Sequence, residues 1–407
     1  MDRRAFFAGA AGVLEIMAGA QAGDTPTSSA EINRLIEQLG SRRFRQREQA
    51  GNALEKIGKP ALTALRTASK SHVDGEVRRR AQLLIEAIGK SISGEVHCFG
   101  GHNAPVWAVA LSDNGDQGFS AGLDATIRGW DCAAGKETRS WDMRPLMMRS
   151  LALSSDSARI LAGGNMGALV LMDVRTGAEL HRFQGHQAGL VRSVALSPDG
   201  TRALSGGFDG TMRLWDIKSG RELWSITLAK NGIRSHVYCV AFSLDGKQLL
   251  ACTGNEIHIR DVKRRVVLQF RQLTRGVTGV FSPDCRRLLW GDTAGVVHVL
   301  DMRTSRELRQ FRAQPCPGAL SSSPQPEFSG TAVVSLALAR DGHRLVSGHI
   351  DGTVRMWNAA TGKELHCAAR HTDEVTSVAC SRDGKWALSG SRDRTLRLWR
   401  MPAGRNG

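Results

Sequence analysis

Serine, histidine and aspartate recur along this chain at spacings that could support nucleophilic chemistry. Three sets share one order, namely His102, Ser120 and Asp124; His186, Ser205 and Asp209; and His371, Ser389 and Asp393. A serine that gives its proton to a histidine oriented by an aspartate is the arrangement of many hydrolases. Each set, however, is followed six residues after its aspartate by a tryptophan, at Trp130, Trp215 and Trp399. A site repeated in this way is interpreted as scaffolding, so we expect no catalytic residue.

The elements that carry these sets form a repeat between residues 99 and 401. The residues at the tryptophan position in the seven copies are Trp130, Met172, Trp215, Arg260, Leu300, Trp357 and Trp399. The steps between them are 42, 43, 45, 40, 57 and 42 residues. A period of about 40–45 residues with Gly-His and Trp-Asp punctuation is typical of a β-propeller array.

Each copy contains four short apolar-alternating runs. In the third copy they cover residues 191–196, 202–205, 211–215 and 222–224, separated by Gly, Asp, Ser and Pro. Such runs with turn residues between them predict four antiparallel strands. One small sheet cannot bury both of its faces, so neighbouring sheets must stack around an axis.

These motifs resemble the WD-repeat β-propeller family over roughly three quarters of the chain, most specifically in copies one, three, six and seven. The resemblance implies that the histidine, serine, aspartate and tryptophan of a copy form a hydrogen-bonded network inside one blade. The sixth copy keeps Ser347, Asp351 and Trp357 but lacks the Gly-His histidine. Copies two, four and five lose most of the pattern, and we expect their blades to be less tightly pinned.

The ends of the repeat region predict how the ring closes. The last copy stops after its third strand, while residues 94–99 before the first copy resemble the fourth-strand segment 178–183. We therefore expect residues 94–99 to supply the outer strand of the last blade. The predicted fold is an all-β seven-bladed propeller at 94–401, preceded by a small all-α segment.

Residues 1–92 differ from the repeats. Residues 1–22 have a charged start with Arg3 and Arg4, an apolar middle and a small-x-small ending, which resembles a bacterial twin-arginine signal peptide and predicts an exported, periplasmic protein. The alternative is a cytoplasmic protein with an N-terminal extension.

Residues 28–92 show helical periodicity in four runs. Ser28 and Glu31 fit a capping box, Pro60 is expected to open the third helix, and Gly89 is expected to end the fourth. The two helix pairs resemble HEAT-like repeats.

Composition limits the classes of ligand. Lys and Arg number 55 against 39 Asp and Glu, which gives a basic protein with a net charge of +16. The charge would suit an acidic partner or nucleic acid, but we rank nucleic acid behind protein because its motifs are missing. None of the eight cysteines shows a zinc-site spacing, so we expect no metal, no cofactor and no disulfide framework. No other stretch reaches the length of a membrane span.

The resemblance also implies a partner-docking surface on the end of the propeller where the blade-connecting loops gather. The residues placed there by their position in the repeat are Trp107, Leu123, Arg149, Arg192, Phe208, Tyr238, Arg275, Ile350, Glu374 and Arg392. Aromatic and arginine side chains dominate interface energies, and the arginines favour an acidic partner. A Pro/Ser-rich insertion at 313–330 accounts for the 57-residue step and is expected on the same end as a flexible spacer.

No P-loop, dinucleotide fingerprint, zinc helix or nucleophile elbow is present in the sequence. Our first hypothesis is a non-enzymatic protein-interaction scaffold. The alternatives are an exported propeller that binds a small ligand in its channel, and a protein that binds an anionic polymer or nucleic acid through its basic surface. The oligomeric state stays open.

Overall fold

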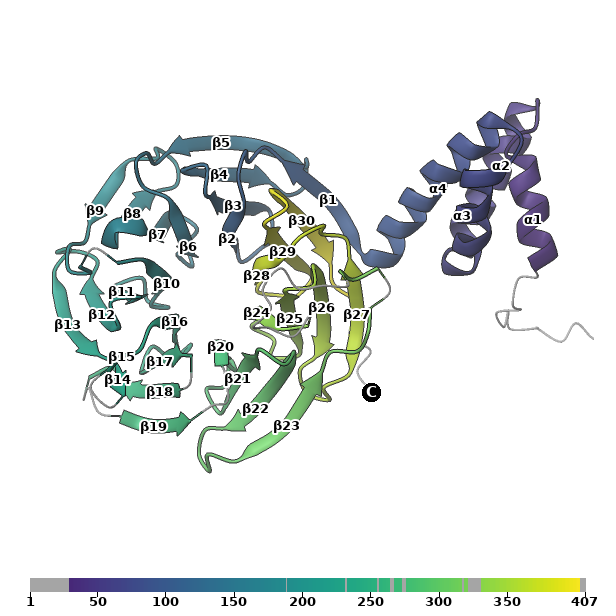
Figure 1. Cartoon of the computed structure of the whole chain (residues 1–407). Helices are drawn as coiled ribbons and strands as arrows, with labels where there is room; N and C mark the ends of the chain where they lie inside the picture. The colour runs from purple at the N-terminus through teal and green to yellow at the C-terminus, as the bar shows by residue number, and fades with distance from the viewer. Residues whose placement is uncertain are drawn as a thin grey trace, which may run out of the picture. The chain divides into compact units, whose positions relative to one another are not determined.

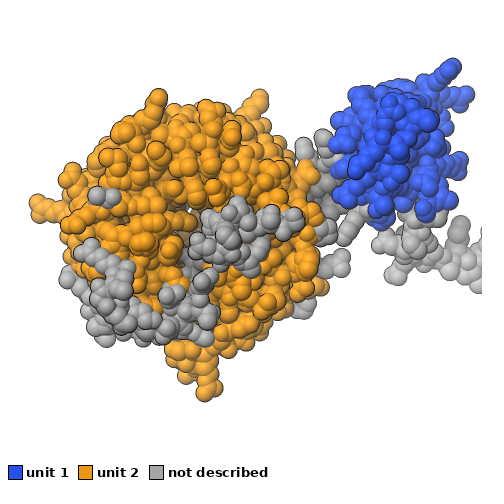
Figure 2. All heavy atoms as spheres, in the orientation of Figure 1, with its two compact units in different colours: residues 1–89 blue, residues 90–407 orange. Residues whose placement is uncertain are grey.

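The computed structural model describes residues 29–402, apart from 188, 231–232, 255, 264–266, 273–275, 317 and 321–330. The chain divides into two compact units, Met1–Gly89 and Lys90–Gly407, which Figure 2 shows in different colours. The expectations for residues 1–22, for Ser28 and for Arg275 lie outside the described residues.

Four α-helices precede the strands. They are α1 (Ser29–Gln38), α2 (Phe44–Ile57), α3 (Leu62–Ser71) and α4 (Gly75–Ser93), with the short 3-10 helix η1 (Lys59–Ala61) before α3. Each helix turns an apolar stripe toward the others, so that Leu39, Leu54 and Leu65 are fully buried in one cluster.

Two of the expected helix boundaries are wrong. Pro60 lies in η1 instead of opening α3, and α4 continues past Gly89 to Ser93. The helix ends where Gly94 adopts a φ of 67°. A glycine in this left-handed conformation is a common stop signal, whereas a glycine in a helix interior only weakens the helix.

Seven four-stranded antiparallel sheets form the propeller, which confirms the predicted fold (Figure 1). Blade one contains β2 (Val106–Leu111), β3 (Gln117–Gly122), β4 (Thr126–Asp131) and β5 (Lys136–Asp142). Blade two contains β6 (Met148–Leu153), β7 (Arg159–Gly164), β8 (Leu169–Asp173) and β9 (Glu179–Arg182), with the 3-10 helix η2 (Asn165–Gly167) after β7. Blade three contains β10 (Val191–Leu196), β11 (Arg202–Gly207), β12 (Thr211–Asp216) and β13 (Glu222–Thr227).

The remaining blades repeat this order, and the small hairpin β14 (Ala229–Lys230) and β15 (Ile233–Arg234) connects blades three and four. Blade four contains β16 (Val237–Phe242), β17 (Gln248–Thr253), β18 (Glu256–Asp261) and β19 (Val267–Gln272). Blade five contains β20 (Gly276–Phe281), β21 (Arg287–Asp292), β22 (Val296–Asp301) and β23 (Glu307–Arg312). Blade six contains β24 (Val333–Leu338), β25 (Arg344–His349), β26 (Thr353–Asn358) and β27 (Glu364–Ala369).

Blade seven joins the two ends of the repeat region. It contains β28 (Val375–Cys380), β29 (Trp386–Ser391) and β30 (Thr395–Arg400), and its outer strand is β1 (Glu95–Gly100). β1 pairs antiparallel with β30, with His97 opposite Leu398 and Phe99 opposite Leu396. The ring in Figure 1 therefore closes through hydrogen bonds between strands from its two ends.

The core lies between neighbouring blades. Leu204 and Leu214 of blade three pack in one cluster with Val237 and Leu249 of blade four. The close approach depends on a glycine, because a Cβ on Gly206 would lie 2.5 Å from Val237 Cγ1.

Serines on the inner strands add polar links between blades. The Val194 N–H donates to Ser150 Oγ at 3.0 Å, and the Val240 N–H donates to Ser193 Oγ at 3.0 Å. These contacts hold the inner strands of blades two, three and four side by side along the central channel.

Candidate functional site

Three blades contain the same buried hydrogen-bond network. In blade one, His102 Nδ1 lies 2.9 Å from Asp124 Oδ2, and its Nε2 lies 2.7 Å from Ser120 Oγ. The Trp130 indole N–H donates to the same Oγ at 2.8 Å. The corresponding distances from histidine to aspartate, histidine to serine and tryptophan to serine are 3.0, 2.7 and 2.9 Å in blade three and 2.8 Å each in blade seven.

The electrostatics of these networks favour one protonation state. Burial lowers the pKa of His102 and of His371, so both imidazoles are neutral near pH 7. Burial alone would raise the pKa of Asp209, but hydrogen bonds from His186 and Thr211 outweigh it and lower the pKa to about 2. A neutral imidazole can then donate from Nδ1 to the aspartate and accept the serine hydroxyl at Nε2.

The connectivity is that of a catalytic triad, but the blades enclose its serine side chains. The serine side chains are fully enclosed, with Ser120, Ser205 and Ser389 all 0% exposed. A nucleophile must reach its substrate within about 3.5 Å, and no substrate can approach these oxygen atoms. The networks therefore tie the turn before the inner strand to the second and third strands of the same blade.

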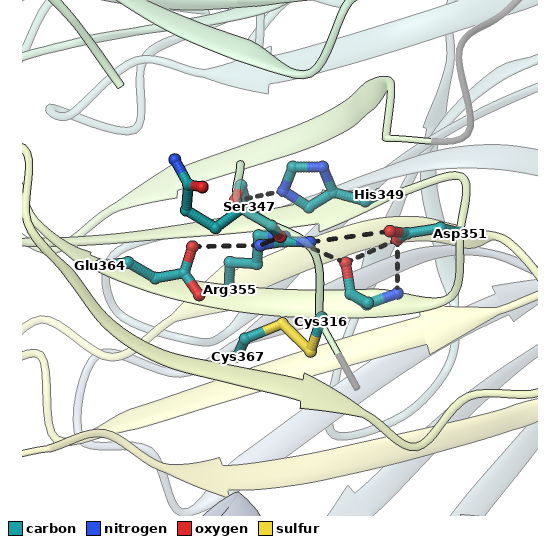
Figure 3. The surroundings of a disulfide bond; sticks show 9 residues. Cys316, Ser347, His349, Asp351, Arg355, Glu364 and Cys367 are labelled. Atoms are coloured by element: carbon teal, nitrogen blue, oxygen red, sulfur yellow. Dashed lines mark hydrogen bonds and ion pairs between the residues drawn. A yellow bond between two sulfur atoms is a disulfide. The ribbon is translucent and has the colours of Figure 1, made fainter. Parts of the chain in front are cut away.

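Blade six has a histidine that the sequence reading missed. His349 Nε2 lies 2.7 Å from Ser347 Oγ (Figure 3). The Trp357 indole donates to the same Oγ at 2.8 Å. The histidine comes from β25 itself, two residues after the serine, and its Nδ1 lies 2.8 Å from the Thr331 carbonyl. The statement that blade six lacks its histidine is therefore true of the Gly-His turn but not of the network.

Blade five uses different polar residues. His298 lies between Asp292 and Glu307, with ring nitrogen to oxygen distances of 3.2 and 3.1 Å. The Trp290 ring stacks on the imidazole with centroids 3.8 Å apart. Leu300, at the tryptophan position, is buried in the core. This blade thus has a polar cluster of its own in place of the tryptophan network.

A β-bulge recurs at the start of every inner strand, and in blades one to four, six and seven the side chain of its extra residue lines the central channel. A bulge reorients the side chain of its extra residue. We call the four large side chains at this position the channel-mouth ring; they are Trp107, Arg149, Arg192 and Tyr238 of blades one to four. The corresponding residues in blades six and seven are Val334 and Thr376.

Within the ring, arginine and tryptophan are in direct contact. The Arg149 guanidinium carbon lies 3.8 Å from the Trp107 ring centroid, and that of Arg392 lies 5.9 Å from it. Arg392 also pairs with Glu374, with Nη1 to Oε2 at 3.4 Å. Sequence position alone placed these four residues on one end of the propeller, and the structure brings them together.

An aromatic cluster continues the surface from blade three to blade four. Phe208 stacks on His236 with centroids 4.5 Å apart and meets Tyr238 edge-on at 5.7 Å. His236 is exposed and was not anticipated from the sequence. The only indication in the sequence is its position two residues before Tyr238 of the channel-mouth ring.

Three other predicted docking residues are less accessible to a partner. Leu123 is half-buried, and its N–H donates to the Pro105 carbonyl at 2.9 Å. Ile350 is only 2% exposed and packs inside, so it offers no docking surface. Glu374 is 8% exposed and neutralises Arg392.

The channel contains two cavities. One of about 220 Å³ lies behind the channel-mouth ring, and another of about 430 Å³ is lined by apolar residues such as Leu111, Phe242 and Phe281. No histidine or carboxylate lines either cavity in the described part of the chain. Over the same described ranges, no three His, Cys, Asp or Glu side chains gather as metal ligands.

A disulfide corrects the expectation that the cysteines form none. Cys316, in the insertion before blade six, is bonded to Cys367 on β27 (Figure 3). Beside it, the buried Arg355 donates from Nη1 to the Gln314 carbonyl at 2.6 Å and pairs with Glu364 at 3.0 Å. The described part of the insertion is therefore tied to blade six instead of being a free spacer.

Comparison with known proteins identifies the repeats. The sequence profile of the family "WD domain, G-beta repeat" matches residues 93–131, 177–216, 227–261, 322–358 and 362–400. The matched ranges leave out Met172 and Leu300, where the tryptophan of the repeat is replaced.

Three relatives show how far the likeness extends. A serine-threonine kinase receptor-associated protein of Dictyostelium discoideum is 26% identical over 264 residues, which cover 64% of this chain and 82% of that protein. The U3 snoRNP-associated protein-like YAOH of Oryza sativa subsp. japonica is 31% identical over 106 residues, or 22% of this chain and 21% of the relative. The U3 snoRNP-associated protein-like EMB2271 of Arabidopsis thaliana is 31% identical over 131 residues, or 28% and 27%.

These relatives overturn the predicted location. They are eukaryotic proteins, and several are described as U3 snoRNP-associated, so the prediction of a bacterial exported, periplasmic protein is wrong. Among the helices that the structure describes, none is both long and apolar enough to cross a bilayer.

Proposed function

This chain is a WD-repeat β-propeller, and we propose that it is a non-enzymatic scaffold that docks a protein partner at its channel mouth. The match to the relative from Dictyostelium discoideum covers 82% of that protein, which is described as receptor-associated. Both facts support the proposal. Fold alone does not fix function, so the argument depends on the site.

The observation that carries the proposal is the continuous surface formed by the channel-mouth ring and the aromatic cluster. Trp107 and Tyr238 are half-buried at equivalent bulges, and Phe208 and His236 extend the surface outward. Rigid aromatic side chains beside arginine are the residues that most often dominate binding energy at protein interfaces. A partner bound there would bury more of the Trp107 and Phe208 side chains. Their contacts with Arg149 and His236 already hold these side chains in place, so binding would cost little further side-chain entropy.

The test is affinity capture with the full chain from extracts of its native cells. The Trp107→Ala/Phe208→Ala variant removes the two aromatic anchors, and the Leu180→Ala/Leu308→Ala variant is the matched control. Leu180 and Leu308 are exposed by 43% and 49% on the outer strands β9 and β23. We expect a partner that is recovered with the wild type and the control but lost with the aromatic variant, when all three proteins melt alike. Equal recovery with the aromatic variant would contradict docking at the channel mouth.

A second candidate function is binding to an anionic polymer in a ribonucleoprotein. Two observations favour it: the net charge of +16 and the U3 snoRNP-associated relatives. Binding through many phosphate contacts falls steeply with salt, whereas docking that depends mainly on aromatic anchors falls much less. Electrophoretic mobility shifts of a structured RNA over a salt series would separate the two functions.

A further inference from the structure

Two arginines of the channel-mouth ring have no acidic partner. Arg149 and Arg192 occupy the same bulge position in the neighbouring blades two and three, and both line the 220 Å³ channel cavity. Among the described residues, neither guanidinium has a carboxylate within ion-pair distance. By contrast, the arginines on the third strands of four blades do, since Arg128, Arg213, Arg355 and Arg397 each pair with a glutamate.

The surroundings of the two arginines are short of negative charge. The nearby carboxylate is Glu374, and Arg392 already pairs with it at 3.4 Å. Glu374 thus acts on the guanidinium groups of Arg392 and Arg192, whereas Arg149 lies near the like charges of both. Burial, together with the like charges of Arg192 and Arg392, lowers the pKa of Arg149, and burial lowers the pKa of Arg192. Bringing cations together and out of water without a counter-charge is unfavourable, and an arriving anion would relieve it.

Trp107 holds Arg149 in place and supplies a further donor. A guanidinium over an indole ring is attracted by the negative face of the ring, so Arg149 is held in place before a ligand arrives. The Trp107 Nε1 atom is buried and has no hydrogen-bond partner among the described residues. Buried donors without an acceptor are rare in folded proteins, and each one calls for an explanation such as an acceptor that the chain does not supply.

We propose that Arg149 and Arg192 bind one carboxylate side chain from an acidic segment of the partner protein, inserted at the channel mouth. The inference deepens the proposed scaffold function and rests on it. A planar guanidinium matches a carboxylate with two parallel hydrogen bonds, and two guanidiniums from adjacent blades can hold both of its oxygens. The cavity is smaller than the roughly 300–1,000 Å³ of a drug-sized ligand site, so it suits a single side chain.

The size of the cavity favours a carboxylate over a phosphate. A cavity of about 220 Å³ fits a planar carboxylate more readily than the larger tetrahedral phosphate group. A phosphate carries about −1.5 to −2 charges at neutral pH, and Glu374, which acts electrostatically on Arg192, repels it more strongly than it repels a single negative charge. Glu374 therefore reduces the advantage that the two guanidinium charges would give to a dianion.

The test measures the fluorescence anisotropy of a labelled oligoglutamate peptide titrated with the full chain. Arg149→Gln and Arg192→Gln should each weaken binding roughly tenfold, because a charged hydrogen-bonded contact is lost. Arg221→Gln is the matched control, since it removes the same charge from an exposed residue at the edge of the outer strand β13. An oligoglutamine peptide of the same length should not bind.

Three results would overturn the proposal. They are a wild-type protein that does not bind oligoglutamate, equal weakening by Arg221→Gln, and a phosphoserine peptide that binds more tightly than oligoglutamate. Failure here is distinguishable from failure of the scaffold function. Suppose that Arg149→Gln and Arg192→Gln leave oligoglutamate binding unchanged while Trp107→Ala/Phe208→Ala still loses the cellular partner. Docking at the channel mouth is then retained, and the proposed carboxylate site is rejected.

Discussion

Glu95 Oε1 lies 2.9 Å from Arg397 Nη1, although 302 residues separate the two in sequence. Glu95 also accepts from Arg370 Nε at 3.0 Å, and its carboxylate is buried. In blades one, three and six the arginine of the third strand pairs with a glutamate on its own fourth strand nine residues later, as Arg128 does with Glu137. In blade seven that glutamate comes from the other end of the repeat region, so the same pair closes the ring.

Glu95→Gln should weaken this closure. Removing one partner of a buried ion pair leaves Arg397 short of its counter-charge and costs about 3 kcal/mol. Urea unfolding followed by tryptophan fluorescence would measure the loss. Glu179→Gln is the control, because Glu179 starts the outer strand β9 and pairs with Arg182 on the surface, where such a pair contributes less than about 1 kcal/mol. Equal losses in both variants would mean that closure does not depend on this carboxylate.

The sequence could predict the propeller because turn residues and the tryptophan position mark each blade locally. It could also locate β1, since residues 94–99 resemble 178–183 and the last copy lacks a fourth strand. The ends of the helices could not be predicted as well from the sequence. A glycine such as Gly89 is compatible with a helix interior, and it is Gly94 that takes the positive φ at which α4 ends.

Contacts made by side chains outside the repeat pattern could not be predicted. His349 sits on a strand instead of in a Gly-His turn, so no motif distinguishes it from a core residue. The positions of Trp107 and Arg149 followed from the repeat register, but their stacking depends on bulges that leave no mark in the sequence. The disulfide joins cysteines 51 residues apart that have no diagnostic spacing.

Gly206→Ala should destabilise the interface between blades three and four. The added Cβ would lie 2.5 Å from Val237 Cγ1 and 2.8 Å from Val240 Cγ1, and these side chains are buried and stiff. Overpacking of this kind costs about 1–3 kcal/mol in the free energy of unfolding. Gly51→Ala in α2 is the contrasting variant, because its Cβ would meet nothing within 4 Å and alanine favours a helix by roughly 0.5–1 kcal/mol. Thermal melts of both variants against the wild type would check the opposite signs.

Acid should destabilise blade six through His349. Burial lowers the pKa of this imidazole to about 4 from an ordinary value of 6.5. Between these two values the unfolded chain binds a proton that the folded chain does not. The free energy of unfolding therefore falls as pH drops below 6.5, by up to about 1.4 kcal/mol per pH unit, and this contribution levels off near pH 4. Above pH 6.5 His349 contributes no pH dependence.

Urea unfolding at pH 7.5 and pH 5 would measure that contribution. His349→Gln should lower stability at pH 7.5, because Ser347 loses one of its two partners, but should lose less on acidification than the wild type. His343→Gln, at an exposed residue, should follow the wild type at both pH values. A variant His349→Gln that loses as much as the wild type between the two pH values would assign the acid sensitivity to other groups.

Reduction should loosen the insertion from blade six. The Cys316–Cys367 bond closes a loop of 51 residues, and the Leu320 N–H donates to the Asp351 carbonyl at 3.1 Å beside it. The bond removes conformations from the unfolded chain, which in the chain-entropy account stabilises the fold by up to about 4 kcal/mol. We expect a reductant to lower the melting temperature of the wild type and to leave a Cys316→Ser/Cys367→Ser variant unchanged at the reduced value. Cys98→Ser, at an exposed free cysteine, should retain the full response to reductant. Because hydrogen bonds from Arg355 and Leu320 also hold the insertion, an unshifted wild-type melt would show that they suffice without the disulfide.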